Sequence, residues 1–173
     1  MSLFFRLFYV IFAAIFRKRL APLEESVIQL RVLPNDLDLQ GHMNNGRFLT
    51  LMDLGRVDLM VRTGFWKIAR THRWIPLVGT AMISFKRPLN LFQTFELHSR
   101  IVCWDDKWCY IEQRFVRNGR IVTFAWTRGL FRGPSGNVPS KEVLAKAGYR
   151  LKSPPVPRAL KLWIQSEKRR EAA

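Results

Sequence analysis

The most regular hydrophobic pattern in the chain lies between Asn45 and Gly64. Apolar residues recur there every three or four positions, which places them on one face of an α-helix. These positions are Phe48, Leu51, Met52, Gly55, Leu59 and Met60. Asn44 or Asn45 suits the start of the helix, because an asparagine side chain accepts a hydrogen bond from an early backbone N–H, and Gly64 suits its end. We therefore expect a long, largely buried helix, followed by a second short helical segment at 65–74.

Five runs before and after this helix have the pattern of β-strands with one buried face, in which apolar and polar residues alternate. They cover residues 24–33, 76–88, 93–104, 108–117 and 120–132. Asn118-Gly119, between the last two runs, is the strongest hairpin signal in the chain, because both central residues of such a turn need a positive φ. One long helix and about five strands predict an α+β domain, in which an antiparallel sheet wraps around the helix.

The N-terminal segment has a different pattern. Residues 3–16 are apolar apart from Arg6 and Tyr9, and the basic run Arg17-Lys18-Arg19 follows directly. The uninterrupted apolar run of about ten residues reaches ~15 Å as a helix, about half of the ~30 Å hydrocarbon core of a bilayer. We expect a helix that lies in a membrane interface with its basic residues at the headgroups. One alternative is a helix that packs on the domain or on a second subunit. The other is a cleaved signal peptide, in which basic residues should instead precede the apolar run.

These patterns divide the chain into three parts. An N-terminal anchor covers residues 1–20, one domain covers 21–137, and a basic helical extension covers 138–173. In the extension, Ser140 suits the N-cap of a short helix that ends near Gly148. The last segment places apolar residues on one helical face among lysines and arginines. We expect it either to contact a membrane or to form a solvated tail.

Charge narrows the choice of partners. The 173 residues include 29 Lys and Arg against 13 Asp and Glu, which gives a formal net charge of +16. A hydrophobic content of 48% excludes disorder as the dominant state. Nucleic acid, an anionic membrane surface and a phosphorylated substrate are the partners that such a charge favours, and a solvated basic surface is the alternative. The chain lacks an aromatic and basic RNA- or DNA-binding motif, which disfavours nucleic acid.

The two cysteines, Cys103 and Cys109, are too few for a disulfide framework or a zinc site. They flank a predicted turn at 105–107, so we expect them to face each other across two strands. We interpret them as reduced thiols of a reducing compartment.

The stretch from Asp36 to Asn45, between the first strand and the long helix, concentrates acids, amides, a glycine and a histidine. The chain has no glycine-rich phosphate loop, no nucleophile elbow and no histidine pattern for a metal. A carboxylate can deprotonate water or attack an acyl carbon, and a helix N-terminus can stabilise the resulting oxyanion. Asp38 is therefore the candidate base or nucleophile, and the backbone N–H near Asn45 is the candidate oxyanion donor. The alternative is that Asp36 and Asp38 only cap the turn and the helix.

The run from Asp36 and Asp38 through Gly41-His42 and Asn44-Asn45 to Arg47-Phe48-Leu49 resembles the signature of hotdog-fold acyl-CoA thioesterases of the 4-hydroxybenzoyl-CoA thioesterase-like group. The resemblance extends from about residue 26 to residue 131. The expected layout, a helix held in an antiparallel sheet, is also that of the hotdog fold. Within this group the chain is most similar to the thioesterase superfamily member six type, on the residues 104–107 and 110–116 of the later hairpin and on its apolar N-terminus.

The resemblance implies roles for individual residues. Asp38 matches the catalytic carboxylate, and the backbone at Asn45 matches the position that polarises the thioester carbonyl. Gly41, His42 and Asn44 match motif positions that shape the loop or orient the substrate. It also implies an acyl-CoA substrate, no cofactor other than the coenzyme A of the substrate, no metal, and a homodimer or tetramer with sites at the subunit interface. The expected location is cytoplasmic and peripheral to a membrane through the N-terminal helix.

Four further positions bear on the expected activity, and the resemblance itself does not fix the two basic ones. A second branch of the fold uses an acid on the central helix, which makes Asp53 an alternative acid. Lys86 and Arg87, at a strand end, are candidate contacts for the phosphates of coenzyme A, and a solvated strand end is the alternative. Gly46 departs from the bulkier or polar residue that is common there, and glycine weakens a first helical turn. A non-catalytic hotdog module that binds acyl chains or protein partners at a membrane is the second functional hypothesis.

Overall fold

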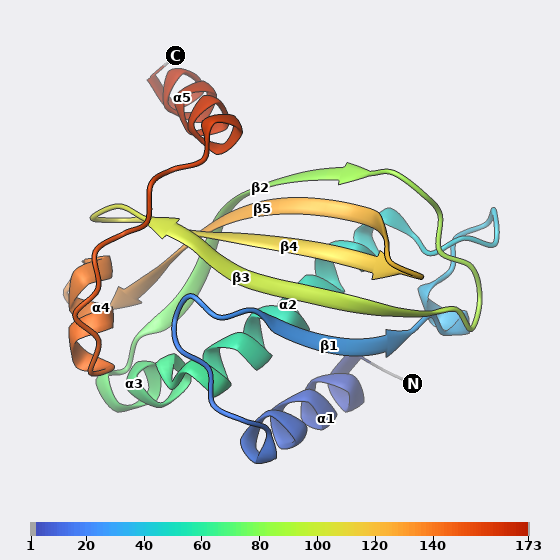
Figure 1. Cartoon of the computed structure of the whole chain (residues 1–173), viewed down its shortest axis with the longest axis horizontal. Coiled ribbons are helices and arrows are strands. Elements are labelled where there is room, and N and C mark those ends of the chain that lie inside the picture. The colour runs from blue at the N-terminus through green and yellow to red at the C-terminus, as the bar shows by residue number, and fades with distance from the viewer. Residues whose placement is uncertain (1–2, 173) are drawn as a thin grey trace.

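An antiparallel sheet curves around helix α2 (Asn45–Thr63) in a computed structural model of the chain, which describes residues 3–172 (Figure 1). The strand order is β1-β3-β4-β5-β2, and β6 pairs with the end of β5. The strands are β1 (Ser26–Arg31), β2 (Ile75–Phe85), β3 (Thr94–Trp104), β4 (Cys109–Arg117), β5 (Arg120–Gly133) and β6 (Gly136–Val138). All five expected strands are confirmed, and β6 is an addition. The predicted hairpin is confirmed as well, since Asn118 and Gly119 have φ values of 49° and 68°.

Both ends of α2 are where the sequence predicts them. The side chain of the N-cap Asn44 accepts a hydrogen bond from the Gly46 N–H, and Gly64 ends the helix with a φ of 84°. In mid-helix, Gly55 faces β3 so closely that a Cβ there would lie 2.9 Å from Leu97 Cδ2. A side chain at this position would therefore push α2 away from the sheet.

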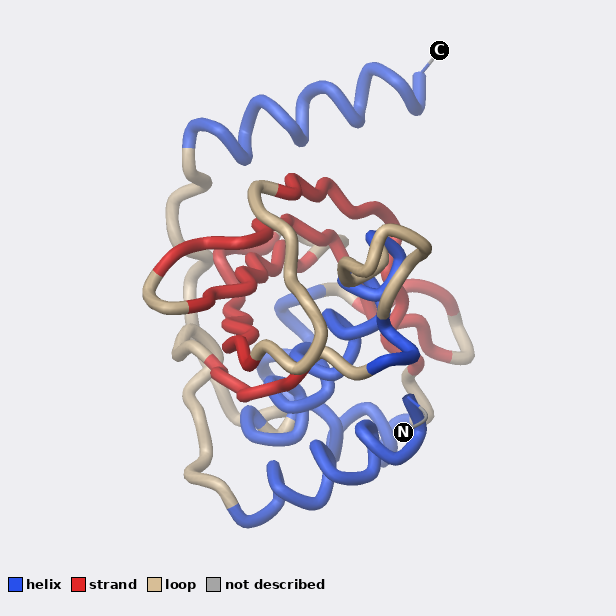
Figure 2. Tube along the Cα trace, turned by 90° about the vertical axis from the view of Figure 1, so that its right-hand side faces the viewer, coloured by secondary structure: helices blue, strands red, loops and turns tan. Residues whose placement is uncertain are grey.

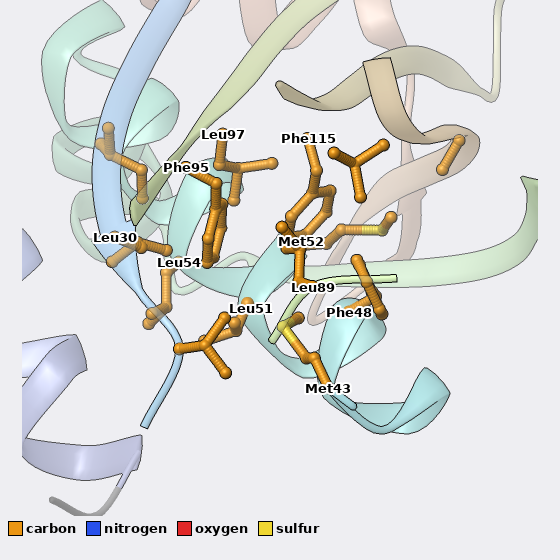
Figure 3. Close-up of a cluster of buried hydrophobic side chains, with 14 of the residues drawn as sticks. Leu30, Met43, Phe48, Leu51, Met52, Leu54, Leu89, Phe95, Leu97 and Phe115 are labelled. Carbon is orange, nitrogen blue, oxygen red and sulfur yellow. The ribbon is translucent and has the colours of Figure 1, made fainter. Parts of the chain in front are cut away.

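The main core lies between α2 and the concave face of the sheet (Figure 3). Phe48, in the first turns of α2, packs edge-on against Phe115 of β4 with 4.9 Å between ring centroids. The other buried members of this core include Leu30, Met43, Leu51, Met52, Leu54, Leu89, Phe95 and Leu97. Burial of one such side chain contributes about 1.5–3 kcal/mol. This cluster fixes the N-terminal half of α2, and hence the loop before it, against the strands.

Four more helices lie on the two sides of the sheet (Figure 2). They are α1 (Leu3–Phe16), α3 (Phe65–His72), α4 (Ser140–Lys146) and α5 (Arg158–Ala172). The prediction that Ser140 caps α4 is wrong. The N-cap is Pro139, which makes no side-chain capping bond, and Ser140 is the first helical residue. The Ser140 N–H instead donates to the carbonyl of Asp106 at 3.0 Å, which ties the helix start to the β3–β4 turn.

Helix α5 crosses the face of the sheet opposite α2 (Figure 2). Leu160 is fully buried there and packs in a cluster with Tyr110 and Trp126. Glu167 on the same helix is buried and lies 3.7 Å from Arg128 of β5. The expectation that the apolar face of this tail contacts a membrane or water is therefore wrong. That face, with Leu160, Trp163 and Ile164, packs on the outer face of the sheet.

Helix α1 packs beside α2 and β1 (Figure 1), and its inward side consists of Arg6 among apolar residues such as Val10 and Ala14. Arg6 is only 4% exposed, so the prediction that it lies at the headgroups is wrong; its guanidinium binds a buried carboxylate of the domain. The outward side chains, each 63–75% exposed, are Phe4, Phe5, Phe8, Tyr9, Phe12, Ile15 and Phe16. Within residues 3–172, no helix is both long and apolar enough to cross a membrane.

The two edges of the sheet differ. At β1, Arg6 and Arg17 donate hydrogen bonds to the outward carbonyls of Arg31 and Val27, at 3.2 and 2.6 Å. At β2, in the part of the chain that the structure describes, β5 is the strand on one side and no strand lies on the other. The large apolar residues that are exposed on this edge strand are Ile75, Leu77, Val78 and Phe85.

The cysteines are free thiols near the β3–β4 turn, and the reducing compartment inferred from them stays a prediction. Burial, with a smaller contribution from the negative charge of Asp105, raises the pKa of Cys103 to about 11. Burial also raises the pKa of Cys109 to about 12, with Cys103 and Asp105 adding to the effect. Because the thiolate is the nucleophile, neither cysteine is suited to nucleophilic catalysis at neutral pH.

Candidate active site

The loop between β1 and α2 closes on itself through its backbone. The Asp38 N–H donates to the His42 carbonyl at 2.8 Å, and the Gly41 N–H donates to the Asp38 carbonyl at 3.1 Å. Gly41 has a φ of 77°, a conformation that glycine adopts without the penalty that other residues pay. At the base of the turn, the Met43 N–H donates to the Leu89 carbonyl at 2.7 Å. Residues 38–42 therefore form a hydrogen-bonded turn fixed to the connection between β2 and β3.

The carboxylate of Asp38 is partly held by this turn. Its Oδ1 accepts hydrogen bonds from the backbone N–H groups of Gln40 and His42, at 2.9 and 3.3 Å. Both hydrogen bonds that residues 3–172 give this carboxylate fall on Oδ1. Asp38 is half-buried, so the carboxylate is oriented by the protein while its Oδ2 remains available to a water molecule or a substrate.

The start of α2 lies a few residues further along the same loop. Asn44 is the N-cap: its own N–H donates to the carbonyl of Asp36 at 2.8 Å, and its Oδ1 accepts from the Gly46 N–H at 2.8 Å. A Cβ on Gly46 would lie 3.1 Å from that Oδ1, so glycine leaves room for the cap. Asn45 is exposed and is the first helical residue, and the N–H of such a residue has no partner within the helix. This N–H is suited to bind a polarised oxygen.

His42 contributes to the loop through its backbone. It is half-buried, its carbonyl accepts from Asp38, and it forms an isolated β-bridge with Asn90. Asp38, Gly41, His42 and the amides at 44–45 therefore belong to one short segment, as the motif implies. Their catalytic roles stay a prediction.

Asp36 has a different position from Asp38, although the two are only two residues apart. It is fully buried and binds both Arg6 and Arg47, with an Arg6 Nη2 to Oδ2 distance of 2.6 Å and an Arg47 Nε to Oδ1 distance of 3.3 Å. Its Oδ2 also accepts from the Leu33 N–H at 2.9 Å, which is the capping role considered for it. The ion pair with Arg6 has a signal in the sequence: a lone arginine inside an apolar helix needs a partner.

The alternative acid Asp53 lies elsewhere. It is on the exposed side of α2, eight residues or about 12 Å beyond Asn45 along the helix axis, and it is paired with Arg56. Burial lowers the pKa of Arg56, and Asp53 partly offsets this effect. The Arg56 guanidinium also donates to Gln113 Oε1 at 2.6 Å. Asp53 and Arg56 line an apolar cavity of about 370 Å³ between α2 and strands β2, β4 and β5.

A basic pocket lies at the end of β2. It has a volume of about 340 Å³ and is lined by Arg87, Pro88, Arg117, Asn118, Arg120 and Val122. Lys86 precedes it and lies outside this lining, while its N–H donates to the Val122 carbonyl at 2.8 Å. The chain continues from Pro88 to Leu89 and Asn90, which contact the turn of Asp38. Arg117 and Arg120 were missed in the sequence, where their only signal is that they flank the hairpin turn.

Within residues 3–172, no group of three or more His, Cys, Asp and Glu side chains is arranged to hold a metal ion. The groups that this region brings together are one oriented carboxylate, one helix N-terminus and a cluster of arginines.

Comparison with known proteins defines the class. The chain matches the family model described as the thioesterase-like superfamily over residues 32–164, and it belongs to this family. The matched range contains the loop of Asp38, Asp53 and the basic pocket, and it leaves out α1. Thioester hydrolysis is the reaction class of this family, and the antiparallel sheet with its helix is the hotdog layout that the sequence predicts.

Individual relatives narrow the comparison. The chain is 34% identical to Protein THEM6 of Xenopus laevis over 136 residues, which cover 78% of this chain and 64% of that protein. It is 37% identical to Protein THEM6 of Danio rerio over 146 residues, which cover 83% of this chain and 70% of that protein. The match thus spans less than two thirds of the frog relative. The solved structure of YbaW Probable Thioesterase from Escherichia coli has a TM-score of 0.64 and 19% identity, and covers 70% of this chain and 97% of that chain. The two relatives named THEM6 confirm the similarity to the member six type, and the bacterial structure shows the shared fold.

Proposed function

We propose that the chain is an acyl-CoA thioesterase that hydrolyses a thioester to a free acid and coenzyme A. The Asp38 carboxylate takes a proton from a water molecule, whose oxygen attacks the thioester carbonyl carbon. The Asn45 N–H stabilises the negative charge on the carbonyl oxygen. The C–S bond then breaks, and the departing thiolate takes up the proton. In the nucleophilic variant, Asp38 attacks the carbonyl carbon itself and water cleaves the resulting anhydride.

One observation carries this proposal. The Asp38 carboxylate is held through one oxygen by its own turn, in the loop that leads into the N-terminus of α2. A panel of acyl-CoAs of increasing chain length, with free thiol as the readout, tests it by comparing the wild type with Asp38→Ala. Hydrolysis by the wild type and its loss in the variant are expected. Equal rates for the two proteins would exclude Asp38 as the catalytic carboxylate.

The basic pocket supports coenzyme A as the leaving group. Coenzyme A carries a diphosphate and a 3′-phosphate, and arginine side chains bind phosphate through paired hydrogen bonds. We place these phosphates at Arg87, with Lys86 beside it and with Arg117 and Arg120 across the pocket. The pocket joins the turn of Asp38 through Leu89 and Asn90, so the nucleotide and the thioester of one substrate are assigned to neighbouring parts of the surface.

The open edge of β2 supports a homodimer. Its exposed apolar side chains and unpaired backbone suit addition of a second sheet, and symmetric pairing of identical edges gives a closed two-fold dimer. We propose that two copies join through β2. The cavity beside Asp53 borders this strand, so the partner would cover part of it.

The outward face of α1 supports association with a membrane on its cytoplasmic side. Seven exposed apolar or aromatic side chains form one face, and the chain as a whole is strongly basic. Co-sedimentation with phosphatidylserine vesicles tests this. The triple variant Phe5→Ser/Phe8→Ser/Phe12→Ser should remain in the supernatant, because these exposed positions contribute to binding and little to the fold. Equal sedimentation of both proteins would exclude α1 as the contact.

The same face favours a second candidate function, a non-catalytic module that holds acyl chains or protein partners at a membrane. Saturable acyl-CoA binding by the wild type with no thiol release at any chain length would support this function over hydrolysis.

A further inference from the structure

Arg6 is an arginine in an otherwise apolar helix surface that packs on the domain. Its neighbours on the buried side of α1 are Val10 and Ala14. The guanidinium makes a two-pronged contact with the Asp36 carboxylate, Nη1 to Oδ1 at 3.2 Å and Nη2 to Oδ2 at 2.6 Å. Nη2 also donates to the Arg31 carbonyl at the end of β1, at 3.2 Å. Both charged groups are almost completely removed from water, with exposures of 4% for Arg6 and 0% for Asp36.

Asp36, the partner of Arg6, contacts several parts of the loop that carries the candidate active site. The Asp36 backbone carbonyl accepts from the N–H of Asn44, the N-cap of α2. Its carboxylate accepts from the Leu33 N–H and pairs with Arg47 in the first turn of α2. Asp36 therefore joins the end of β1, the start of α2 and the turn that begins two residues later with Asp38. A shift of Asp36 would move the carboxylate and the helix N-terminus together.

We propose that Arg6 is a positioning residue: by holding Asp36, it fixes the loop that carries Asp38 and the N-terminus of α2. This role rests on the proposed hydrolysis. It makes α1 part of the active-site architecture in addition to any contact that its outer face makes. Arg6 lies outside residues 32–164, which match the family model, so it is a feature of this chain's N-terminal helix rather than of the matched domain.

The opposite end of α1 supplies a matched control. Arg17, directly after α1, binds the buried carboxylate of Asp58 at 3.3 Å and the carbonyl of Val27 at 2.6 Å. Asp58 lies in the C-terminal half of α2 and is also bound by Ser26 and Arg62. Arg6 and Arg17 thus make the same kind of contact between the N-terminal segment and the domain. Arg6 reaches the loop of Asp38, whereas Arg17 reaches a position more than three helical turns further along α2.

Three full-length variants test the proposal: Arg6→Met, Arg6→Lys and Arg17→Met. Steady-state kinetics with an acyl-CoA that the wild type hydrolyses gives kcat and KM, and amide hydrogen exchange gives the opening of residues 36–47. For Arg6→Met we expect kcat to fall about 10- to 100-fold, because a displacement of about 1 Å costs up to this much, with KM changing far less. Exchange in residues 36–47 should rise. The kcat and loop exchange of Arg6→Lys should lie between those of the wild type and Arg6→Met, because lysine keeps the positive charge but lacks the planar guanidinium that binds both carboxylate oxygens. Arg17→Met should keep the wild-type kcat and loop exchange.

Wild-type kcat and wild-type exchange in Arg6→Met would overturn the proposal. So would equal losses in Arg6→Met and Arg17→Met, which would show a general packing role of the N-terminal segment. Arg6→Met leaves Asp36 without its main partner. If this variant does not fold, the double variant Arg6→Met/Asp36→Asn, which removes both charges, is measured in its place. Raised exchange in residues 36–47 of the double variant would support the proposal, and wild-type exchange would overturn it. If the wild type hydrolyses no acyl-CoA, the proposed function fails, and the exchange comparison still decides whether Arg6 holds the loop.

Discussion

The two edge strands of the sheet differ, because β1 is covered by the N-terminal segment and β2, within the described residues, is uncovered. At β1, Arg6 and Arg17 donate to outward carbonyl groups, and α1 covers the edge. At β2, the outer backbone has no neighbouring strand among residues 3–172, and apolar side chains are exposed along it. An uncovered edge is a template for another strand, and natural proteins close or charge the edges that must stay alone. The difference shows that the N-terminal segment closes one edge, and it supports the proposal that the other edge pairs with a second copy.

The edges also separate two parts of the candidate machinery. The covered edge runs into the loop of Asp38. The open edge ends at Arg87 and the basic pocket, and it borders the cavity beside Asp53. Substitutions near the covered edge should therefore affect hydrolysis, whereas substitutions near the open edge should affect dimer formation and substrate binding. The sizes of these effects test whether the two edges have separate roles.

The largest expected effect is on the covered side. Asp38→Asn keeps the shape of the side chain and removes its charge, so kcat for acyl-CoA hydrolysis should fall about 10²- to 10⁴-fold, the usual contribution of a general base. Asp53→Asn, on the other side, should change kcat by less than about tenfold, because Asp53 is exposed and paired with Arg56. Free-thiol release with both variants checks this. A larger loss in Asp53→Asn would move the chemistry to the open side.

The open edge predicts the next effect. Leu77→Glu places a charge among the exposed apolar residues of β2, and the dimer dissociation constant should rise about 30-fold or more, the effect of losing a strong interface contact. Gln29→Glu, at an exposed position of β1, is the matched control and should leave it unchanged. Sedimentation equilibrium measures both. A monomeric wild type, or equal weakening by the two variants, would contradict the assignment of the edges.

The basic pocket predicts a change in KM. Arg120→Gln removes one charged donor from the pocket, and KM for acyl-CoA should rise about tenfold with kcat little changed, since one hydrogen bond to a charged group contributes about 1.5–3 kcal/mol. The matching acyl-pantetheine thioester lacks the nucleotide phosphates and should show no such rise. An equal rise for both substrates would place the effect of Arg120 outside phosphate binding.

The smallest effect concerns Glu25, just before β1. Burial raises the pKa of its carboxyl. Hydrogen bonds from His98 and Arg114, together with the charges of these two residues, lower the pKa by more than burial raises it, so it lies below its ordinary value. A lowered pKa gives stability that is present above the unfolded value of about 4.5 and is lost as the pH falls through the folded value. Glu25→Gln should therefore cost about 1 kcal/mol or less at pH 7 and less than that at pH 3, which lies below the ordinary pKa. Urea unfolding at both pH values measures this, and an equal cost at pH 3 would exclude charge as its origin.

Local patterns predict most of the fold. The spacing from Phe48 to Met60 predicts α2, Asn44 and Gly64 predict its ends, and Asn118-Gly119 predicts the central hairpin. Each of these features depends on neighbours a few residues away. The motif also brings Asp38 and Asn45 into one segment, because the loop between them is short.

Other parts of the site could not be predicted in this way. Arg87 meets Arg117 and Arg120 only because β2 pairs with β5 and the β4–β5 turn returns to the same end of the sheet. Arg6 meets Asp36 across thirty residues of chain. A helical wheel places Arg6 on a narrow polar face, but it does not say whether that face turns toward lipid headgroups, water or protein.

The sequence by itself determined most of the elements, both ends of α2 and the thioesterase-like motif, because these follow from side-chain periodicity, turn geometry and a short run of residues. The tertiary structure alone decided the direction of α1, the packing of α5 on the outer face of the sheet and the choice of the open edge. The physical reason is desolvation. A carboxylate buried as deeply as Asp36 is stable only with a cation beside it, and this requirement turns Arg6 inward and leaves the aromatic face of α1 outside.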